Sequence, residues 1–91
     1  MRRAAKIDAN QPAIVKALEA IGCSVYYIKE PVDLAVGLRK RTVLMEVKNP
    51  EADWQLTPQQ EKFFREFNGE AYIVEDEGQA IRAMMGKEAM A

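Results

Sequence analysis

Asp33, Glu46 and Lys48 are the residues of this chain whose types and spacing could do chemistry. Two carboxylates a few ångströms apart repel one another unless a cation lies between them. Mg²⁺ takes one or two carboxylates with water and substrate phosphate, so Asp33, Glu46 and a backbone carbonyl such as that of Val47 would suffice to hold it. Such a metal polarises a phosphoryl oxygen and lowers the pKa of a bound water, while Lys48 could position that water or offset developing negative charge. These residues predict a site that hydrolyses phosphodiesters.

The spacing of Glu46 and Lys48 also has an ordinary interpretation. Glu-x-Lys is a short pattern and both residue types favour solvent, so the tripeptide alone is more typical of a solvated strand face. The preceding stretch changes the balance, because its large apolar residues alternate with Asp33, Ala35 and Gly37. The face that carries Asp33 therefore has little side-chain bulk and leaves room for a ligand.

Two strands joined by a short turn are expected to position these residues. Residues 33–38 (DLAVGL) and 42–48 (TVLMEVK) suit a pleated, half-buried surface, and Asn49-Pro50 is a stop signal. Because the intervening Arg39-Lys40-Arg41 is short and polar, the strands should form an antiparallel hairpin.

The register of this hairpin decides whether the polar residues meet. If paired residue numbers sum to about 81, Asp33 lies opposite Lys48, and Ala35 lies opposite Glu46 on the same face. That register requires a loop with an even number of residues or a bulge, because a three-residue loop without one turns Asp33 to the other face. The apolar alternation on both strands favours the clustered version.

The rest of the chain predicts an α+β fold in the order α-β-β-β-α-β, with a short C-terminal helix. The first helix carries one apolar stripe, with Asn10 or Asp8 as its N-cap and Gly22 as its stop. The expected helices are 11–21, 57–68 and 76–85, and the expected strands are 24–29, 33–38, 42–48 and 70–75.

The aromatic residues and Gln60 of the second helix each have two possible roles. Its expected buried stripe consists of Leu56, Phe63, Phe64 and Phe67. Gln60 points to the same side, yet Thr57-x-x-Gln60 also fits a capping box, and both roles can hold together. Trp54 and the phenylalanines could instead form a protein interface, although aromatic residues at helical spacing are more often core.

Composition limits the classes of protein and site. The 91 residues make one domain, 1–91, which is marginal as a monomer and would gain from oligomerisation. We expect a cytoplasmic protein, since no apolar run approaches a membrane span and the basic start lacks the apolar segment of a signal peptide. The chain has no histidine and one cysteine, which excludes an internal disulfide, most zinc sites and histidine-based triads. A bound metal should therefore be a hard ion held by oxygen.

Charge is unevenly distributed along the chain. The net charge is −1, but residues 1–48 hold nine Lys/Arg against five Asp/Glu, and residues 49–91 hold four against nine. The basic half includes the candidate site and the turn residues Arg39, Lys40 and Arg41. A local basic face can bind phosphates, although these charges are equally consistent with simple solubility.

The strings PVDL, VG, LMEVKNP and LTPQQEKFF, in this order, resemble the VRR-NUC domains of the PD-(D/E)XK (restriction-endonuclease-like) nuclease superfamily. The resemblance covers approximately residues 8–83 and implies metal-dependent cleavage of DNA. It makes Asp33 and Glu46 metal ligands, Lys48 the catalytic lysine and Gln60 a helix glutamine near the site. Small stand-alone members are similar to phage or prophage proteins, and such members act as homodimers on branched DNA.

Two positions depart from the family pattern. Val32 separates Pro31 from Asp33, whereas family members often have proline directly before the aspartate. Related enzymes also carry a glutamate in the first helix at about the position of Gln11, and an amide cannot neutralise charge. If that glutamate is required, metal binding is weaker or activity is absent.

Two hypotheses of different kinds follow. The first is an Mg²⁺- or Mn²⁺-dependent endonuclease, a homodimer that acts on branched or flapped DNA of the Holliday-junction type. The second is a non-catalytic DNA-binding or assembly module that retains the nuclease fold. A cluster of Asp33, Glu46 and Lys48 on an open face supports the first, and a divergent register or a closed face supports the second.

Overall fold

Three helices and four strands make up the computed structural model, which describes residues 8–86. The elements are α1 (Gln11–Ala20), β1 (Ser24–Tyr27), β2 (Leu34–Leu38), β3 (Arg41–Val47), α2 (Pro58–Glu66), β4 (Ala71–Val74) and α3 (Glu77–Met85). This order confirms the predicted sequence of elements and the α+β class. Most predicted elements extend one to three residues beyond the observed ends.

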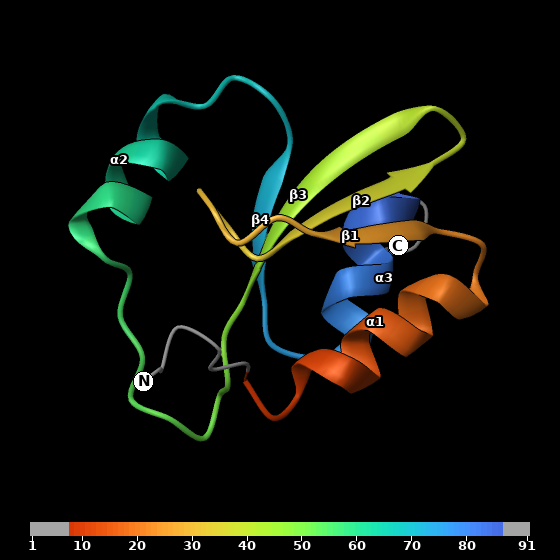
Figure 1. Cartoon of the computed structure of the whole chain (residues 1–91), viewed down its shortest axis with the longest axis horizontal. Coiled ribbons are helices and arrows are strands. Elements are labelled where there is room, and N and C mark those ends of the chain that lie inside the picture. The colour runs from red at the N-terminus through yellow and green to blue at the C-terminus, as the bar shows by residue number, and fades with distance from the viewer. Residues whose placement is uncertain (1–7, 87–91) are drawn as a thin grey trace.

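The strands form one mixed sheet in the order β1-β2-β3-β4. The first three strands run antiparallel to their neighbours, and β4 pairs parallel to β3. A parallel neighbour needs a crossover connection, and α2 lies within that connection. Figure 1 shows α1 and α3 on one side of the sheet and α2 on the other.

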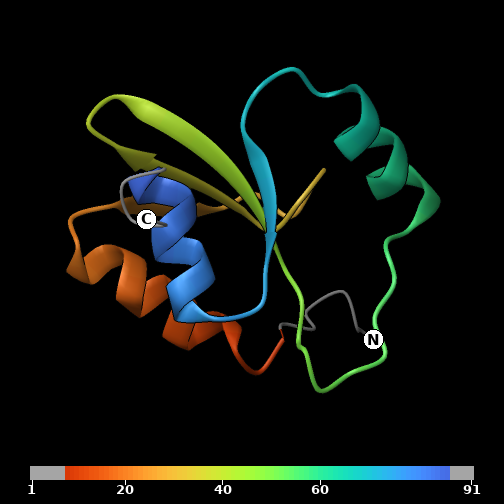
Figure 2. The same ribbon diagram turned by 180° about the vertical axis from the view of Figure 1, so that it is seen from behind.

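The core lies between the sheet and the helix pair α1 and α3, which lie next to each other in both views (Figures 1 and 2). Alternate residues of β2 and β3 point into it, as the period of a strand requires. The largest fully buried side chains are Ile14, Leu18, Val32, Leu34, Val36, Val43, Met45, Val47 and Val74.

The first helix begins and ends as its sequence indicates. Asn10 is the N-cap, but its side chain makes no capping hydrogen bond to the helix. Its Nδ2 instead donates to the carbonyls of Lys48 and Glu75, at 3.0 and 2.9 Å. Gly22 has φ +101°, a conformation that glycine adopts without strain, and it follows the last turn as predicted. Asn10 thus attaches the start of α1 to the ends of β3 and β4.

The hairpin differs from the prediction in its turn and register. The turn has two residues, Arg39 and Lys40, both with positive φ, and Arg41 is already the first residue of β3. Leu34 pairs with Met45, so paired numbers sum to 79 rather than about 81. A shift of two residues leaves each side chain on its predicted face, because the side-chain period of a strand is two. The polar cluster therefore survives, with Asp33 continuing the ladder toward Glu46 instead of Lys48.

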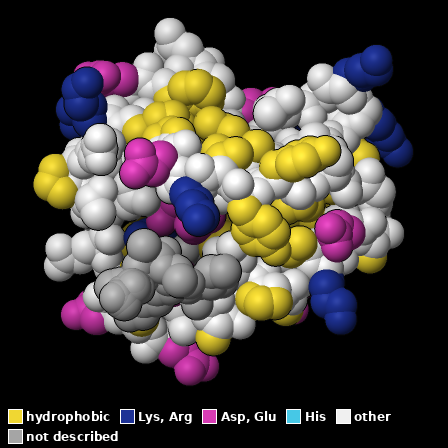
Figure 3. All heavy atoms as spheres, viewed as in Figure 1, with side chains coloured by type: hydrophobic (Ala, Val, Ile, Leu, Met, Phe, Trp, Pro, Cys, Tyr) yellow, Lys and Arg dark blue, Asp and Glu magenta, His cyan; other side chains and the backbone are white. Residues whose placement is uncertain are grey.

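The predicted buried stripe on the second helix is wrong. No residue of α2 is buried; Phe63 and Phe64 are half-buried and Phe67 is 41% exposed. In Figure 1, α2 lies apart from the two helices that cover the other side of the sheet. Figure 3 shows hydrophobic side chains at the surface on the side of α2 that faces the strands.

Across residues 8–86, none of the helices has the length and apolar character needed to cross a membrane.

Candidate active site

Asp33 is positioned by the loop between β1 and β2. Its carbonyl accepts a 2.9 Å hydrogen bond from the backbone N–H of Ile28, and its Oδ2 accepts one of 2.9 Å from the N–H of Val47. The carboxylate thus bonds to the end of β3 in place of a further ladder residue. Because the N–H and C=O of one strand residue point to the same neighbour, the carbonyl of Val47 is directed to the side of Asp33 as well.

Glu46 and Lys48 lie on β3 and just beyond its end, and they form a mostly buried ion pair. Glu46 Oε2 is 3.2 Å from Lys48 Nζ, and the two side chains are 7% and 14% exposed. The other carboxylate oxygen, Glu46 Oε1, is buried without a hydrogen-bond partner. Lys48 Nζ also donates to the carbonyl of Gln55 at 3.4 Å and lies 5.7 Å from the centroid of the Trp54 ring. The lysine is thereby held over the acidic end of the strand.

The two carboxyl groups perturb one another. Burial raises the pKa of Asp33, and the charge of Asp8 adds to the increase, while hydrogen bonds with the Val47 N–H and with the Glu46 side chain lower this pKa. Burial also raises the pKa of Glu46, followed by the charge of Asp33, and Lys48 offsets only part of this increase. Both groups therefore hold a proton more readily than a solvated carboxyl. Adjacent acids with raised pKa values are typical of a functional site.

Gln60 makes the predicted capping box, and it also lies near Glu46. It completes the capping box of α2, since its backbone N–H donates to Thr57 Oγ1 at 3.1 Å and its Oε1 accepts from the Thr57 N–H at 3.3 Å. Its amide nitrogen remains, and its nearness to Glu46 lowers the pKa of that carboxyl against the effect of burial. It does not satisfy Glu46 Oε1, which makes no hydrogen bond.

The oxygen atoms at this point suit a hard divalent cation. Asp33 uses one carboxylate oxygen for the Val47 N–H, and Glu46 keeps Oε1 unpaired and buried. An orphaned buried acceptor beside a second carboxylate is destabilising unless a cation or water satisfies it. Asp33, Glu46 and the Val47 carbonyl would supply oxygen ligands only, as Mg²⁺ and Mn²⁺ prefer. Among residues 8–86, however, no group of three or more acidic or Cys side chains gathers around one such point.

Gln11 occupies the first turn of α1 and is 4% exposed. Its neighbour Asn10 bonds to the carbonyl of Lys48, so this turn is fastened to the end of β3. The structure thus places an amide, and no carboxylate, at the position where the resemblance implies a glutamate.

The basic residues of the hairpin fall into two groups. Arg39 and Lys40 are exposed in the turn. Arg41 binds both carboxylate oxygens of Glu70 and donates to the carbonyls of Ala83 and Met84 at the end of α3. The hydrogen bond with Arg41 lowers the pKa of Glu70. Arg41 is thus a structural link between β3, β4 and α3, and the turn residues are the ones open to an external phosphate.

Three residues contribute to the site in ways that their sequence positions did not predict. Asn10 was considered only as a helix cap, Asp8 only as an alternative cap, and Trp54 only as an interface residue. Trp54 Nε1 donates to Glu75 Oε2 at 2.9 Å, which fixes the ring beneath Lys48. A tryptophan in a loop that also contains acidic residues could have suggested a polar contact of the indole. Nothing in the sequence indicates the hydrogen bonds of Asn10, because its partners are distant along the chain.

In comparisons with known proteins, no family model matches the chain, and neither a curated protein nor a solved structure matches it.

Proposed function

We propose that this protein is a metal-dependent endonuclease that hydrolyses phosphodiester bonds of DNA. The observation that carries the proposal is the unpaired buried oxygen of Glu46 next to Asp33 and Lys48. Most buried polar atoms have a hydrogen-bond partner, so a buried carboxylate oxygen without one is evidence for a bound cation or water. The neighbouring Asp33 carboxylate favours the cation, because a cation would also offset the repulsion between the two acids.

Each residue has a distinct role in this proposal. Asp33, Glu46 and the Val47 carbonyl would hold Mg²⁺ or Mn²⁺, which when bound supplies charge stabilisation for a phosphoryl oxygen and a more acidic water. Lys48, whose ammonium lies 3.2 Å from Glu46, offsets negative charge that develops on the phosphate. Gln60 orients the water or the Glu46 carboxylate from the first turn of α2.

DNA is the proposed substrate because the exposed Arg39 and Lys40 and the VRR-NUC resemblance both favour a polyanion. The PD-(D/E)XK core, a homodimer, and a preference for branched or flapped DNA of the Holliday-junction type belong to the same proposal. A phage or prophage origin and a cytoplasmic location are also part of this proposal. The observed order α1-β1-β2-β3-α2-β4 is consistent with that core.

The test is cleavage of single-stranded, duplex, flap and four-way-junction DNA with Mg²⁺, Mn²⁺ or EDTA. We expect metal-dependent cutting that Lys48→Ala reduces by about 10²–10³-fold, the typical loss for one group that stabilises transition-state charge. Lys16→Ala, an exposed lysine of α1, is the matched control and should cut as wild type does. Thermal melts of both variants show whether the fold is retained. Metal-dependent cutting that persists in Lys48→Ala would contradict the role of this lysine.

A second candidate is a DNA-binding or assembly module without catalysis. It is favoured by the buried amide of Gln11 in the first helix and by a site with only two close carboxylates. This candidate predicts binding to the same DNA panel with no cutting under any metal. Replacing the amide tests it directly, since Gln11→Glu would then increase metal affinity or create activity.

A further inference from the structure

A hollow of about 620 Å³ lies beside the candidate active site, between α2 and the loop that leads into β2. Its walls include Pro31 on the loop side and Gln59, Gln60 and Phe63 on the α2 side. The volume is in the range of pockets that hold small organic ligands. Neither the acid pair nor Lys48 lines it, so the proposed chemistry does not account for this space.

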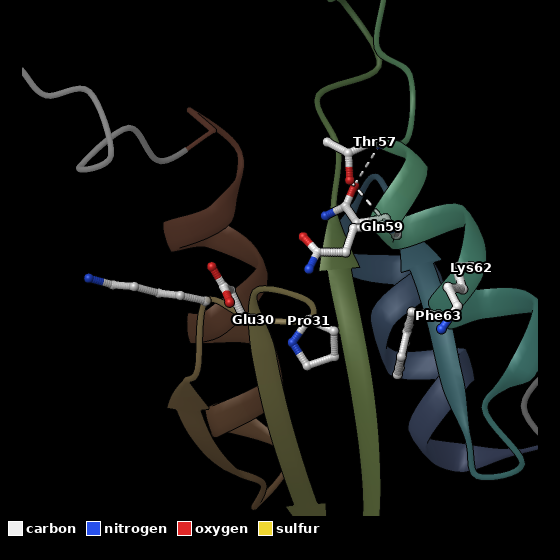
Figure 4. Close-up of a pocket in the computed structure, with 8 residues that line it drawn as sticks. Glu30, Pro31, Thr57, Gln59, Lys62 and Phe63 are labelled. Carbon is white, nitrogen blue, oxygen red and sulfur yellow. Dashed lines mark hydrogen bonds between the residues drawn. The ribbon is translucent and has the colours of Figure 1, made fainter.

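One face of an aromatic ring is turned into the hollow. Figure 4 shows the Phe63 ring edge-on, so that one face of the ring turns toward Pro31. Phe63 is held in this orientation by its neighbours, since it stacks on Phe67 at 4.8 Å and meets the edge of Phe64 at 5.1 Å. An aromatic face that is open to a hollow suits a planar ligand such as a nucleobase.

The polar groups of the hollow suit the edge of a base with its phosphates outside. The side chain of Gln59 extends from α2 toward the Glu30–Pro31 segment (Figure 4), and an amide both donates and accepts hydrogen bonds. Glu30 adds an acceptor for amino groups of bases. Lys29 and Lys62 also line the hollow, and Lys62 forms an exposed ion pair with Glu66 at 3.4 Å. A lone phosphate would be a poorer fit, because it would face Glu30 and leave the Phe63 ring unused.

The hollow adjoins the acid pair through shared elements. Gln60 lines it and approaches Glu46, and Pro31 precedes Asp33 by two residues. We propose that the hollow binds an unpaired nucleobase of single-stranded DNA, next to the phosphate that lies at Asp33, Glu46 and Lys48. This inference rests on the proposed function for its substrate class, and it adds a base-binding site that would select DNA with unpaired nucleotides.

The test measures binding in EDTA, so that its result does not depend on cleavage. Fluorescence anisotropy would follow a labelled oligothymidylate and a labelled duplex of equal length. Phe63→Leu keeps apolar volume and removes the ring face, so it should weaken oligothymidylate binding by about tenfold, the typical effect of losing one stacked base. Duplex binding should change by less than about twofold, because its bases are not available to the hollow. The matched control is Tyr26→Leu, an aromatic on β1 that is 70% exposed outside the hollow and should bind as wild type does.

An abasic scan with the wild-type protein gives a second measurement that requires no variant to fold. Replacing one thymidine at a time should reveal one position where the missing base weakens binding by about tenfold. Equal losses at every position, or unchanged oligothymidylate binding by Phe63→Leu, would overturn the base site. Equal losses of single-stranded and duplex binding in Phe63→Leu would also overturn the base site. The two proposals fail separately, because base binding can persist in a protein that never cuts DNA, and metal-dependent cutting can persist without a base site.

Discussion

Glu46 is placed at a cost to stability. Its Oε1 is buried without a partner. Burial raises the pKa of Asp33 and of Glu46, and the charge of Asp33 raises the pKa of Glu46 further. A buried acceptor without a hydrogen bond costs roughly 1–3 kcal/mol. Local choices that oppose stability concentrate at functional sites, where a ligand supplies the missing interaction. The acid pair is therefore better explained by a ligand than by the folding of this domain.

Asp33→Asn should stabilise the metal-free protein at neutral pH. In the wild type the folded state binds the proton of Asp33 more tightly than the unfolded state, whose aspartate titrates near pH 3.9. Wild-type stability therefore falls as the pH rises above about 4 and through the raised pKa of the folded state. The substitution removes this deficit and keeps an oxygen for the Val47 N–H. We expect a gain of about 0.5–1 kcal/mol in urea unfolding at pH 7 with EDTA, which vanishes below about pH 4.

Bound metal should make the wild type more stable than Asp33→Asn, the reverse of their order without metal. A cation at 100 times its dissociation constant stabilises the folded state by about 2.7 kcal/mol, so Mg²⁺ should stabilise wild type and have little effect on Asp33→Asn. Asp53→Asn, in the exposed loop after β3, is the control and should stay within about 0.5 kcal/mol of wild type. A variant that is less stable than wild type at pH 7 in EDTA would contradict the strained acid pair.

At the scale of elements, the turn of the β2–β3 hairpin carries two basic residues where other residue types would be more stable. A two-residue turn with positive φ at both positions favours Asn-Gly, yet the chain has Arg39 at φ 53° and Lys40 at φ 70°. A left-handed conformation destabilises a residue with a Cβ by about 1–2 kcal/mol, and glycine avoids this strain. Glycine also loses more conformational entropy on folding, which offsets roughly 0.5–1 kcal/mol of that advantage. Lys40→Gly should therefore raise the free energy of unfolding by about 0.5–1 kcal/mol.

The same substitution tests the turn as a DNA contact. Losing one phosphate contact should reduce the slope of log K against log salt by about 0.9 in duplex-binding titrations. Lys16→Gly provides the matched control, because glycine in an exposed helix costs about 1 kcal/mol and this helix should not alter the salt slope. A destabilised Lys40→Gly would contradict the left-handed turn, and an unchanged slope would remove Lys40 from the DNA surface.

How far the sequence predicts this molecule depends on the element. The faces of β2 and β3 were correct because apolar alternation in Leu34–Leu38 and around Met45 fixes which side chains are buried. The register was wrong by two residues because a shift of two preserves that alternation, and only the turn length decides it. The burial of α2 was wrong because the spacing of Phe63 and Phe67 reveals an apolar stripe but not whether the helix packs against anything. The Asn10 bonds to β3 and β4 depend on tertiary structure alone.

At the scale of the whole molecule, the chain divides into a packed layer and a loosely attached helix. The sheet, α1 and α3 share the buried core, whereas α2 lies on the opposite side of the sheet and buries no residue (Figures 1 and 2). The acid pair belongs to the packed layer, and Gln60 and the aromatic wall of the hollow belong to α2. A ligand that spans the two parts would bring α2 against the sheet, so substrate binding and the position of α2 should be coupled.

Amide hydrogen exchange can measure this division, with α3 as an internal control. The helices α2 and α3 have nine residues each, but α3 buries Ala80 and Met84 whereas α2 buries none. Protection follows the burial that must be lost when a segment opens, so α2 should exchange about a hundredfold or more faster than α3, the ratio that about 2.7 kcal/mol of opening free energy gives. Adding oligothymidylate with EDTA should slow exchange in α2 and leave α3 unchanged. Equal protection of the two helices in the free protein would show that α2 packs on the sheet in solution, and the hollow beside the acid pair would then be closed.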